Sequence, residues 1–218
     1  MKPKDIHKEI NEVTEDLISI GLCEDQNFPS FIEKNGNIIS ISVSEFESSK
    51  LLKNVDYISI YNELKSKRNF NIKMVDGAMI LFQYEFQNSE LLKHRLSYFP
   101  SLSLLEFQNN YEIYEIDELY ADVIEKQIVT FPMRFDYDSR EEVYKVVDHP
   151  KSHLTLGQFK NCRIPVSAPI TPNRFIHFII RNFYHTTYKK YCDNIRTFEL
   201  SFNETIHPDE KKIVYLSI

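Results

Sequence analysis

Residues 71–86 read NIKMVDGAMILFQYEF, and this stretch decides the fold class of the chain. Asp76-Gly77 separates two strand-like runs, 71–75 and 78–86, and an Asp-Gly pair in that setting is a strong signal for a β-hairpin. In the second run, large apolar side chains recur at every other position and so share one face of a strand: Ile80, Phe82, Tyr84 and Phe86. The sequence therefore predicts an antiparallel sheet built outward from this hairpin.

The residues before the hairpin predict helices and one short strand. Apolar residues recur at helical spacing over 3–20, with Gly21 as the stop. Asn35-Gly36 marks a turn into a strand over 37–43. Ser44 opens a capping box for a helix to about residue 53, and Asp56 caps another to about residue 68.

The residues after the hairpin predict further strands and a long helix. Strands are expected near 93–98, 129–137, 152–156 and 162–165, with closing strands at 195–202 and 212–217, and a helix is expected near 117–126. Pro132 should confine its strand to a sheet edge, because proline cannot donate to a ladder. Thr171 as N-cap and Pro172 as the first helical residue open a long, largely buried helix near 172–190.

Strands grouped in meanders, with helices before and after them, predict an α+β fold with a mostly antiparallel sheet. The 218 residues suit one domain, 1–218, and a division into an N-terminal subdomain, 1–70, and a C-terminal functional part, 71–218, is the alternative.

Composition excludes several function classes. The chain has only four glycines, which are widely spaced, so it cannot form a P-loop or a dinucleotide-binding loop. Three isolated cysteines give no zinc-ribbon or thioredoxin-like spacing, and we expect them to be reduced. No metal or other cofactor is expected. The N-terminus shows no secretory signal and no segment is apolar enough to span a membrane, which favours a cytoplasmic protein without a membrane partner.

Charge is distributed unevenly along the chain. The net charge is −6, yet residues 106–125 contain seven acidic residues and no Lys or Arg, whereas 151–196 contain eight basic residues against one acid, Asp193. This asymmetry indicates a basic face for an anionic partner, although the two blocks could also neutralise each other within the fold.

The long helix carries one polar stripe among apolar side chains. Its members are spaced by three or four residues and therefore share one face: Arg174, His177, Arg181, His185 and Tyr188. We refer to these five residues as the helix stripe. Such a stripe either lines a cleft or faces solvent, and the sequence leaves both alternatives open.

The segment 134–163 concentrates residues that are able to perform acid–base chemistry. Asp136, His149 and His153 supply a carboxylate and two imidazoles, and Arg134 and Arg163 supply guanidiniums. On a strand, Arg134, Asp136 and Asp138 should project from one face while the apolar residues between them pack on the other. Imidazoles can act as general base and acid in metal-free RNA cleavage while arginine stabilises the anionic phosphorane. The two Asp, Asp136 and Asp138, and the two His could instead hold a divalent metal. The structural alternative is an Arg–Asp pair with histidines bonded to the backbone.

Several motifs resemble a bacterial family called domain of unknown function 2290. They are LKHRLSYFP at 92–100, RFDYD at 134–138, HPKSHLTLG at 149–157, CRIP at 162–165 and the helix with FI and RNFY. The resemblance implies a bacterial source and supplies no activity. Residues 134–153 are also similar to small toxin ribonucleases of toxin–antitoxin modules.

Three functional hypotheses follow. In the first, the chain is a metal-independent ribonuclease-like effector of a toxin or phage-defence locus. His149 and His153 perform acid–base catalysis, Asp136 orients an imidazole, and Arg134 and Arg163 bind phosphate.

In the second, the chain binds nucleic acid, RNA above all, without catalysis. Its phosphate-binding residues are Lys151, Lys160, Arg163, Arg174 and Arg181, with His177 and His185 beside them. Phe159 or Tyr188 stacks on a base. In the third, it is a protein-interaction subunit whose partner comes from the same locus.

Overall fold

The hairpin predicted from residues 71–86 lies at the centre of the sheet. A computed structural model describes residues 1–43, 55–102, 131–159 and 161–218. In it β4 (Ile72–Met74) and β5 (Met79–Gln87) pair antiparallel around the Asp76-Gly77 turn, and β6 (Glu90–Phe99) pairs with β5 along its whole length. Gly77 has a φ of 84°, and a Cβ there would lie 3.0 Å from Ser101 Oγ, so the turn requires glycine.

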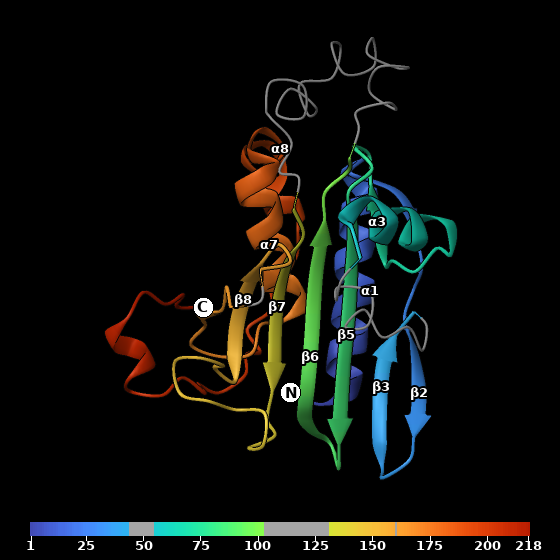
Figure 1. The fold of residues 1–218 in the computed structure, drawn as a ribbon. Helices are drawn as coiled ribbons and strands as arrows, with labels where there is room; N and C mark the ends of the chain where they lie inside the picture. The colour runs from blue at the N-terminus through green and yellow to red at the C-terminus, as the bar shows by residue number, and fades with distance from the viewer. Residues whose placement is uncertain (44–54, 103–130, 160) are drawn as a thin grey trace.

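The described residues form one nine-stranded antiparallel sheet (Figure 1). Its order is β1-β4-β5-β6-β7-β8-β9, and the β2–β3 hairpin joins through pairing of β3 with β5. The sheet thus combines strands from both halves of the chain. The remaining strands are β1 (Cys23–Gln26), β2 (Ser30–Lys34), β3 (Ile38–Ser42), β7 (Met133–Asp138), β8 (Ser152–Leu156) and β9 (Ile164–Pro165).

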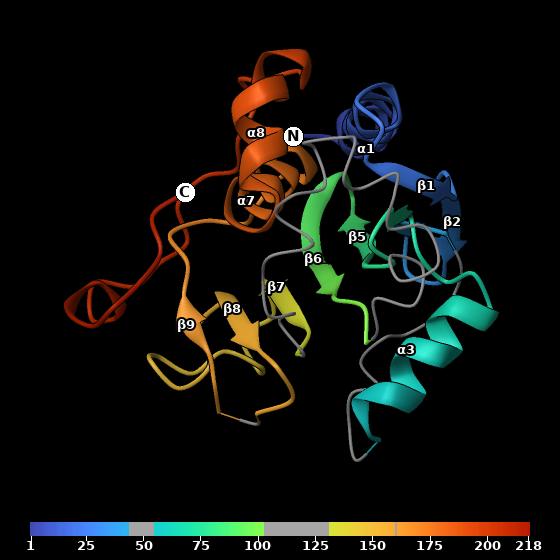
Figure 2. The same cartoon turned by 90° about the horizontal axis from the view of Figure 1, so that it is seen from above.

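Helices cover the two faces of the sheet unequally. Figure 2 shows α1, α7 and α8 on one side of the sheet and α3 on the other. The four are α1 (Pro3–Ser19), α3 (Tyr57–Ser66), α7 (Pro172–Phe183) and α8 (His185–Tyr191), and two 3-10 turns follow, Cys192–Asn194 and Glu210–Lys212. None of the helices in the described residues is long and apolar enough to cross a membrane. The chain is therefore an α+β domain.

Each face of β5 contributes to a separate hydrophobic core. The alternating residues predicted to share one face, Phe82 among them, pack with α1 and α7. Phe175 of α7 is fully buried and lies edge-on to both Phe82 and Phe135, at centroid distances of 6.0 and 5.9 Å. Burial of one such side chain contributes roughly 1.5–3 kcal/mol. On the opposite face, Met79 and Leu81 pack with α3.

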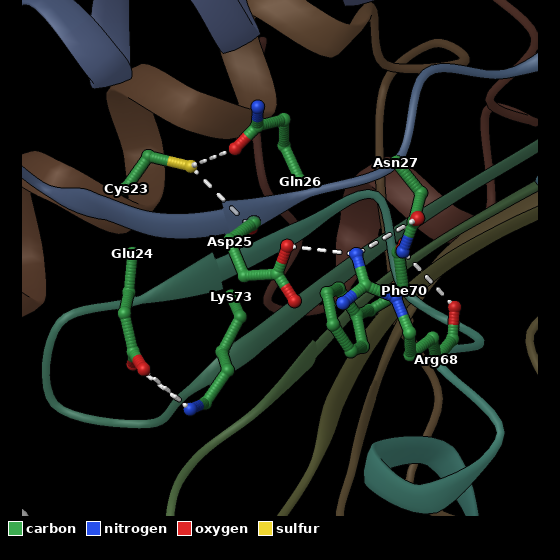
Figure 3. Close-up of polar contacts among 8 residues, drawn as sticks. All are labelled: Cys23, Glu24, Asp25, Gln26, Asn27, Arg68, Phe70 and Lys73. Carbon is green, nitrogen blue, oxygen red and sulfur yellow. Dashed lines mark hydrogen bonds and ion pairs between the residues drawn. The ribbon is translucent and has the colours of Figure 1, made fainter.

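Polar contacts hold the edge strand β1 against its neighbours (Figure 3). Arg68 donates to the Asp25 carboxylate at 2.8 Å, and the Asn27 side-chain amide donates to the Arg68 carbonyl at 3.1 Å. Lys73 on β4 lies 2.9 Å from the Glu24 carboxylate. Each partner therefore comes from β4 or from the turn that precedes it, which fixes the register of this edge.

The three cysteines are free thiols, as the spacing predicted. Cys23 donates to the Asp25 carbonyl at 3.4 Å, and burial raises the pKa of its thiol to about 11. A thiol with a raised pKa is a poor nucleophile at neutral pH.

One strand and the long helix differ from the sequence-based expectations. Pro132 precedes β7 and does not confine it to an edge, since β7 lies between β6 and β8. The long helix is broken at Tyr184, whose buried hydroxyl donates to Asp76 in the central hairpin turn at 2.7 Å. This tertiary contact holds Tyr184 in a non-helical conformation, so α7 and α8 are separate helices.

The closing strands expected at 195–202 and 212–217 are absent from this described part of the chain. The C-terminal segment follows β9 instead, and one parallel bridge joins Val166 to Leu216. Since β9 has only two residues, it offers little edge for a further strand. The expected helix beginning at Ser44 and the acidic helix near 117–126 lie outside the described residues.

Candidate functional site

Polar side chains from β6, β7 and β8 meet on the α3-facing side of the sheet. The register places Arg95 opposite Asp136, and Asp136 opposite His153. It also places Arg134 opposite Thr155. Side chains alternate along a strand, and Phe135 packs in the core with α7, so its neighbours Arg134 and Asp136 project from the other face, as predicted.

Asp136 is the centre of this cluster. Its carboxylate accepts a hydrogen bond from Arg95 Nε at 2.6 Å, and Arg134 Nε lies 3.5 Å away. Thr155 Oγ1 donates to the same carboxylate at 3.4 Å, and His153 Nε2 lies 3.8 Å from it. The Arg–Asp pair of the structural alternative is therefore present, and two guanidiniums share one carboxylate.

Burial and charge act in opposite directions in this cluster. Burial alone would raise the pKa of the Asp136 carboxyl, but Arg95 and Arg134 outweigh it and hold that pKa well below its usual range. Burial lowers the pKa of the His153 imidazole to about 4, although Asp136 acts to raise it. At neutral pH His153 is thus uncharged, and Arg95 and Arg134 carry one positive charge more than Asp136 balances.

Both histidines are oriented by backbone carbonyl groups. His149 Nδ1 lies 2.7 Å from the Val143 carbonyl oxygen, and His153 Nδ1 lies 2.8 Å from that of Pro150. A carbonyl oxygen can only accept, so Nδ1 is the donor in each ring, and the tautomer with this donor leaves Nε2 as an acceptor. The two rings lie 5.1 Å apart between centroids.

A pocket of about 510 Å³ opens beside the cluster. Its lining is polar and rich in cations: Lys145, Val147, Asp148, His149, Asn161 and Arg163. None of the ion pairs found in the described ranges involves Lys145 or Arg163. Arg163 Nη1 lies 3.5 Å from the Asp148 carbonyl oxygen. Lys145, His149 and Arg163 therefore line one pocket, and neither of the two cations is in an ion pair within the described ranges.

The rim of the pocket contains a strained turn. Lys145 and His149 exchange backbone hydrogen bonds of 3.1 and 2.7 Å, which leaves a loop of residues 146–148 between them. Val147 has a φ of 68°, and the Asp148 amide donates to the Val146 carbonyl at 2.8 Å. This is a γ-turn of positive φ, a rare conformation that is unfavourable for a β-branched residue. Strain of this kind concentrates at functional sites.

Glu210 anchors this turn from the C-terminal segment. Its side chain is buried and accepts from the Val147 amide at 3.4 Å and from the His207 amide at 2.9 Å. The segment itself contacts the sheet, because Thr205 Oγ1 lies 3.2 Å from Ser152 Oγ on β8. The C-terminal residues therefore shape the pocket.

The remaining predicted binding residues are not all near the pocket. Lys151 is already engaged, because its ammonium lies 2.5 Å from the Glu141 carboxylate and above the Tyr144 ring. Lys160 lies outside the described residues. The helix stripe lies across the sheet, since α7 packs on the face that carries Phe82 and Phe135.

The helix stripe faces solvent along most of its length. Arg174, Arg181 and His185 are exposed, and His177 is half-buried against Tyr188. The stripe and the 134–163 residues consequently do not share one cleft. Of the two alternatives that the sequence left open, the structure shows a stripe that faces solvent and does not line a cleft.

Three contributors to the site were not predicted from the sequence. Arg95 had no assigned role, although it stands in a strand whose pairing with β7 brings it opposite Asp136. Lys145 and Asn161 line the pocket from loops. Alternation in β6 places Arg95 on the polar face and could have identified it, whereas the loop residues carry no such signal.

The metal-binding alternative finds no support in the geometry of the described ranges. No group of three or more His, Cys, Asp or Glu side chains there is arranged to hold a metal ion. Asp138, the second carboxylate in that alternative, pairs with Arg140 at 2.6 Å.

Comparison with known proteins places the chain in a family. Residues 22–218 match the model of the family described as "Uncharacterized conserved protein (DUF2290)". The chain belongs to this family. No curated protein and no solved structure gives a significant match. The cluster around Asp136, the adjacent pocket and the C-terminal segment all fall within the matched residues of this DUF2290 protein.

Proposed function

We propose that this DUF2290 protein binds an RNA phosphodiester in the pocket and cleaves it without a metal ion. In this proposal His149 is the general base, Arg163 is a phosphate ligand, and Lys145 binds the phosphate and is the general acid. Hard anions such as phosphate are bound by side chains of this kind, and metal-free RNA cleavage uses an imidazole beside a cation.

The orientation of His149 carries the proposal. Its Nδ1 atom is fixed on the Val143 carbonyl at 2.7 Å, so its Nε2 atom remains an acceptor in a pocket that also contains Arg163. A backbone-held imidazole with a free nitrogen is suited to proton transfer, because it is already in one tautomer.

The proposed reaction is an internal transfer at phosphorus. His149 Nε2 takes the proton from the ribose 2′-hydroxyl as its oxygen forms a bond to phosphorus. The bond from phosphorus to the 5′ oxygen then breaks, and this oxygen takes a proton from Lys145. A 2′,3′-cyclic phosphate and a 5′-hydroxyl result, and Arg163 stabilises the charge on the phosphorane oxygens.

His153 serves as a positioning residue in this proposal. It is only 5% exposed, and it does not line the pocket. Its ring lies against that of His149, at a centroid distance of 5.1 Å, and its position is fixed by Pro150 and by the Asp136 cluster. His153 therefore supports the orientation of His149 through the contact between the two rings.

The test is cleavage of end-labelled single-stranded RNA in the presence of EDTA, with three proteins compared. In His149→Asn the side-chain amide retains a donor near the position of Nδ1 while Nε2 is removed. We expect this variant to lose activity by about a hundredfold or more, the usual range for an acid–base residue. His185→Asn on α8, across the sheet and exposed, should retain full activity.

Any of three results would contradict the proposal. The first is that His149→Asn, folded as judged by circular dichroism, cleaves as fast as the parent protein. The second is that the parent protein gives no cyclic phosphate in EDTA at any pH between 5 and 9. Cleavage that requires Mg²⁺ or Mn²⁺ would also reject the metal-free reaction.

A second candidate function is RNA binding without cleavage. The burial of His153 favours it, because only one of the two predicted catalytic imidazoles lines the pocket. Binding that is steeply dependent on salt, with no turnover, would identify this function.

A further inference from the structure

Two exposed phenylalanines stand next to the loop that lines the pocket. Phe159 is 71% exposed and Phe131 is 41% exposed. Phe131 precedes β7 and Phe159 follows β8, and these strands pair with each other. The two residues are therefore brought together by the sheet, although they are distant in sequence.

Gly157 allows the two phenylalanines to lie close together. It has a φ of 61°, and a Cβ there would lie 3.3 Å from Phe159 Cδ2 and 3.5 Å from Phe131 Cβ. A side chain at this position would meet both residues. The Gly157 amide also donates to the Pro132 carbonyl at 2.7 Å, which ties the loop to the residue after Phe131.

The same loop connects Phe159 to the pocket. The Cys162 amide donates to the Phe159 carbonyl at 3.3 Å, and the Arg163 amide donates to the Asn161 carbonyl at 3.0 Å. Asn161 and Arg163 both line the pocket. Phe159 and the pocket-lining residues Asn161 and Arg163 therefore belong to one short turn of the chain.

We propose that Phe159, with Phe131 beside it, is a stacking platform for an unpaired base of the strand whose phosphate occupies the pocket. This inference rests on the proposed function, because the pocket supplies the phosphate contact. An exposed aromatic ring next to cations is the arrangement by which proteins bind single-stranded nucleic acid. In a duplex the base faces are already stacked, so the platform selects single-stranded RNA.

The absence of tryptophan from the chain makes a direct test available. Phe159→Trp introduces a single tryptophan whose emission should be quenched when a base stacks on it. The probe is a twelve-nucleotide single-stranded RNA added in EDTA to the full chain that also carries His149→Asn, so that the RNA stays intact. The control is Phe28→Trp, which places the reporter at a residue 50% exposed near β1, at the opposite edge of the sheet.

We expect quenching of the Phe159→Trp protein by single-stranded RNA and none by the matching duplex or by inorganic polyphosphate. The Phe28→Trp protein should not respond. Phe159→Ala should weaken affinity for the single strand about tenfold, in keeping with the loss of one stacked base, and Phe159→Tyr should restore it. The proposal is overturned if RNA binds without quenching, if duplex and single strand bind equally, or if only lipid vesicles or a protein quench the reporter.

The outcomes separate this inference from the proposed function. RNA that is bound with quenching but never cleaved by the parent protein would leave the platform standing and reject the ribonuclease. Cleavage of RNA in EDTA by the parent protein, without quenching of the Phe159→Trp emission, would support the ribonuclease and reject the platform.

Discussion

Arg95 Nε on β6 donates to Asp136 Oδ1 on β7 at 2.6 Å, and this bond joins two strands that are separated by more than thirty residues of sequence. Arg134 approaches the other carboxylate oxygen at 3.5 Å. The Arg134 Nε atom is buried, and it has no hydrogen-bond partner in the part of the chain that the structure describes. Asp136 is thus the group on which the charge balance of this sheet face depends.

The first prediction concerns Asp136→Asn. The substitution keeps the shape of the side chain but leaves Arg95 and Arg134 without their counter-charge, and we expect it to lower the free energy of unfolding by about 3 kcal/mol. Urea denaturation measures this change. Asp138→Asn removes a more exposed pair with Arg140 and should cost less than about 1 kcal/mol. Equal decreases in the free energy of unfolding for the two variants would show that the charge of Asp136 contributes no more to stability than that of Asp138.

The second prediction concerns pH. Burial lowers the pKa of His153 to about 4 in the folded protein, below its ordinary value of 6.5. Between these pH values the unfolded chain binds a proton that the folded chain excludes, so stability falls as the pH is lowered from 6.5 to 4, by up to about 1.4 kcal/mol per pH unit. His153→Asn keeps a donor for the Pro150 carbonyl and should remove this part of the slope.

The effect of His153→Asn can be separated from that of the other buried histidine. Burial lowers the pKa of His94 to about 3, so the variant should retain the contribution of His94 to acid sensitivity. Urea titrations at pH 7.5, 6, 5 and 4.5 give the slope. An unchanged slope in the variant would mean that His153 is protonated in the folded protein.

The third prediction concerns the strained turn. Val146 and Val147 have similar exposures, 40% and 37%, but only Val147 has a positive φ, 68°. Glycine accepts that conformation freely, so Val147→Gly should be more stable than Val146→Gly by about 1–2 kcal/mol. Thermal or urea unfolding of the two variants provides the comparison. If Val146→Gly is the more stable protein, the turn is not strained as described.

The fourth prediction separates the pocket from the helix stripe. Arg163→Glu should weaken binding of single-stranded RNA and reduce the salt dependence of the logarithm of the binding constant by about one unit, because one phosphate contact is lost. Arg181→Glu makes the same charge change on the other side of the sheet and should have little effect beyond long-range repulsion. Fluorescence anisotropy at several salt concentrations measures both. A larger loss from Arg181→Glu would place the RNA on the helix stripe instead.

Short-range patterns determined much of the fold. The Asp-Gly turn, the alternation in residues 78–86 and the helical spacing in residues 3–20 each specify local geometry, and all three elements form as predicted. The Thr171 cap and Pro172 likewise start α7 at the expected residue. The end of that helix was predicted wrongly, because it depends on a hydrogen bond between Tyr184 and Asp76, 108 residues away in the sequence.

The candidate site shows the same division. Alternation in β7 placed Arg134 and Asp136 on one face, and the sequence correctly grouped them with His153. It could not show that Arg95 completes the cluster, that His153 is buried while His149 lines the pocket, or that the helix stripe lies across the sheet.

The sequence by itself determined α1, the central hairpin, the start of α7 and the polar face of β7, because residue spacing and turn chemistry act over a few residues. Only the tertiary structure decided which strands pair, which imidazole faces the pocket, and that Glu210 holds the turn at Val147. Those features depend on burial and on contacts between distant parts of the chain, which the local pattern of residues does not encode.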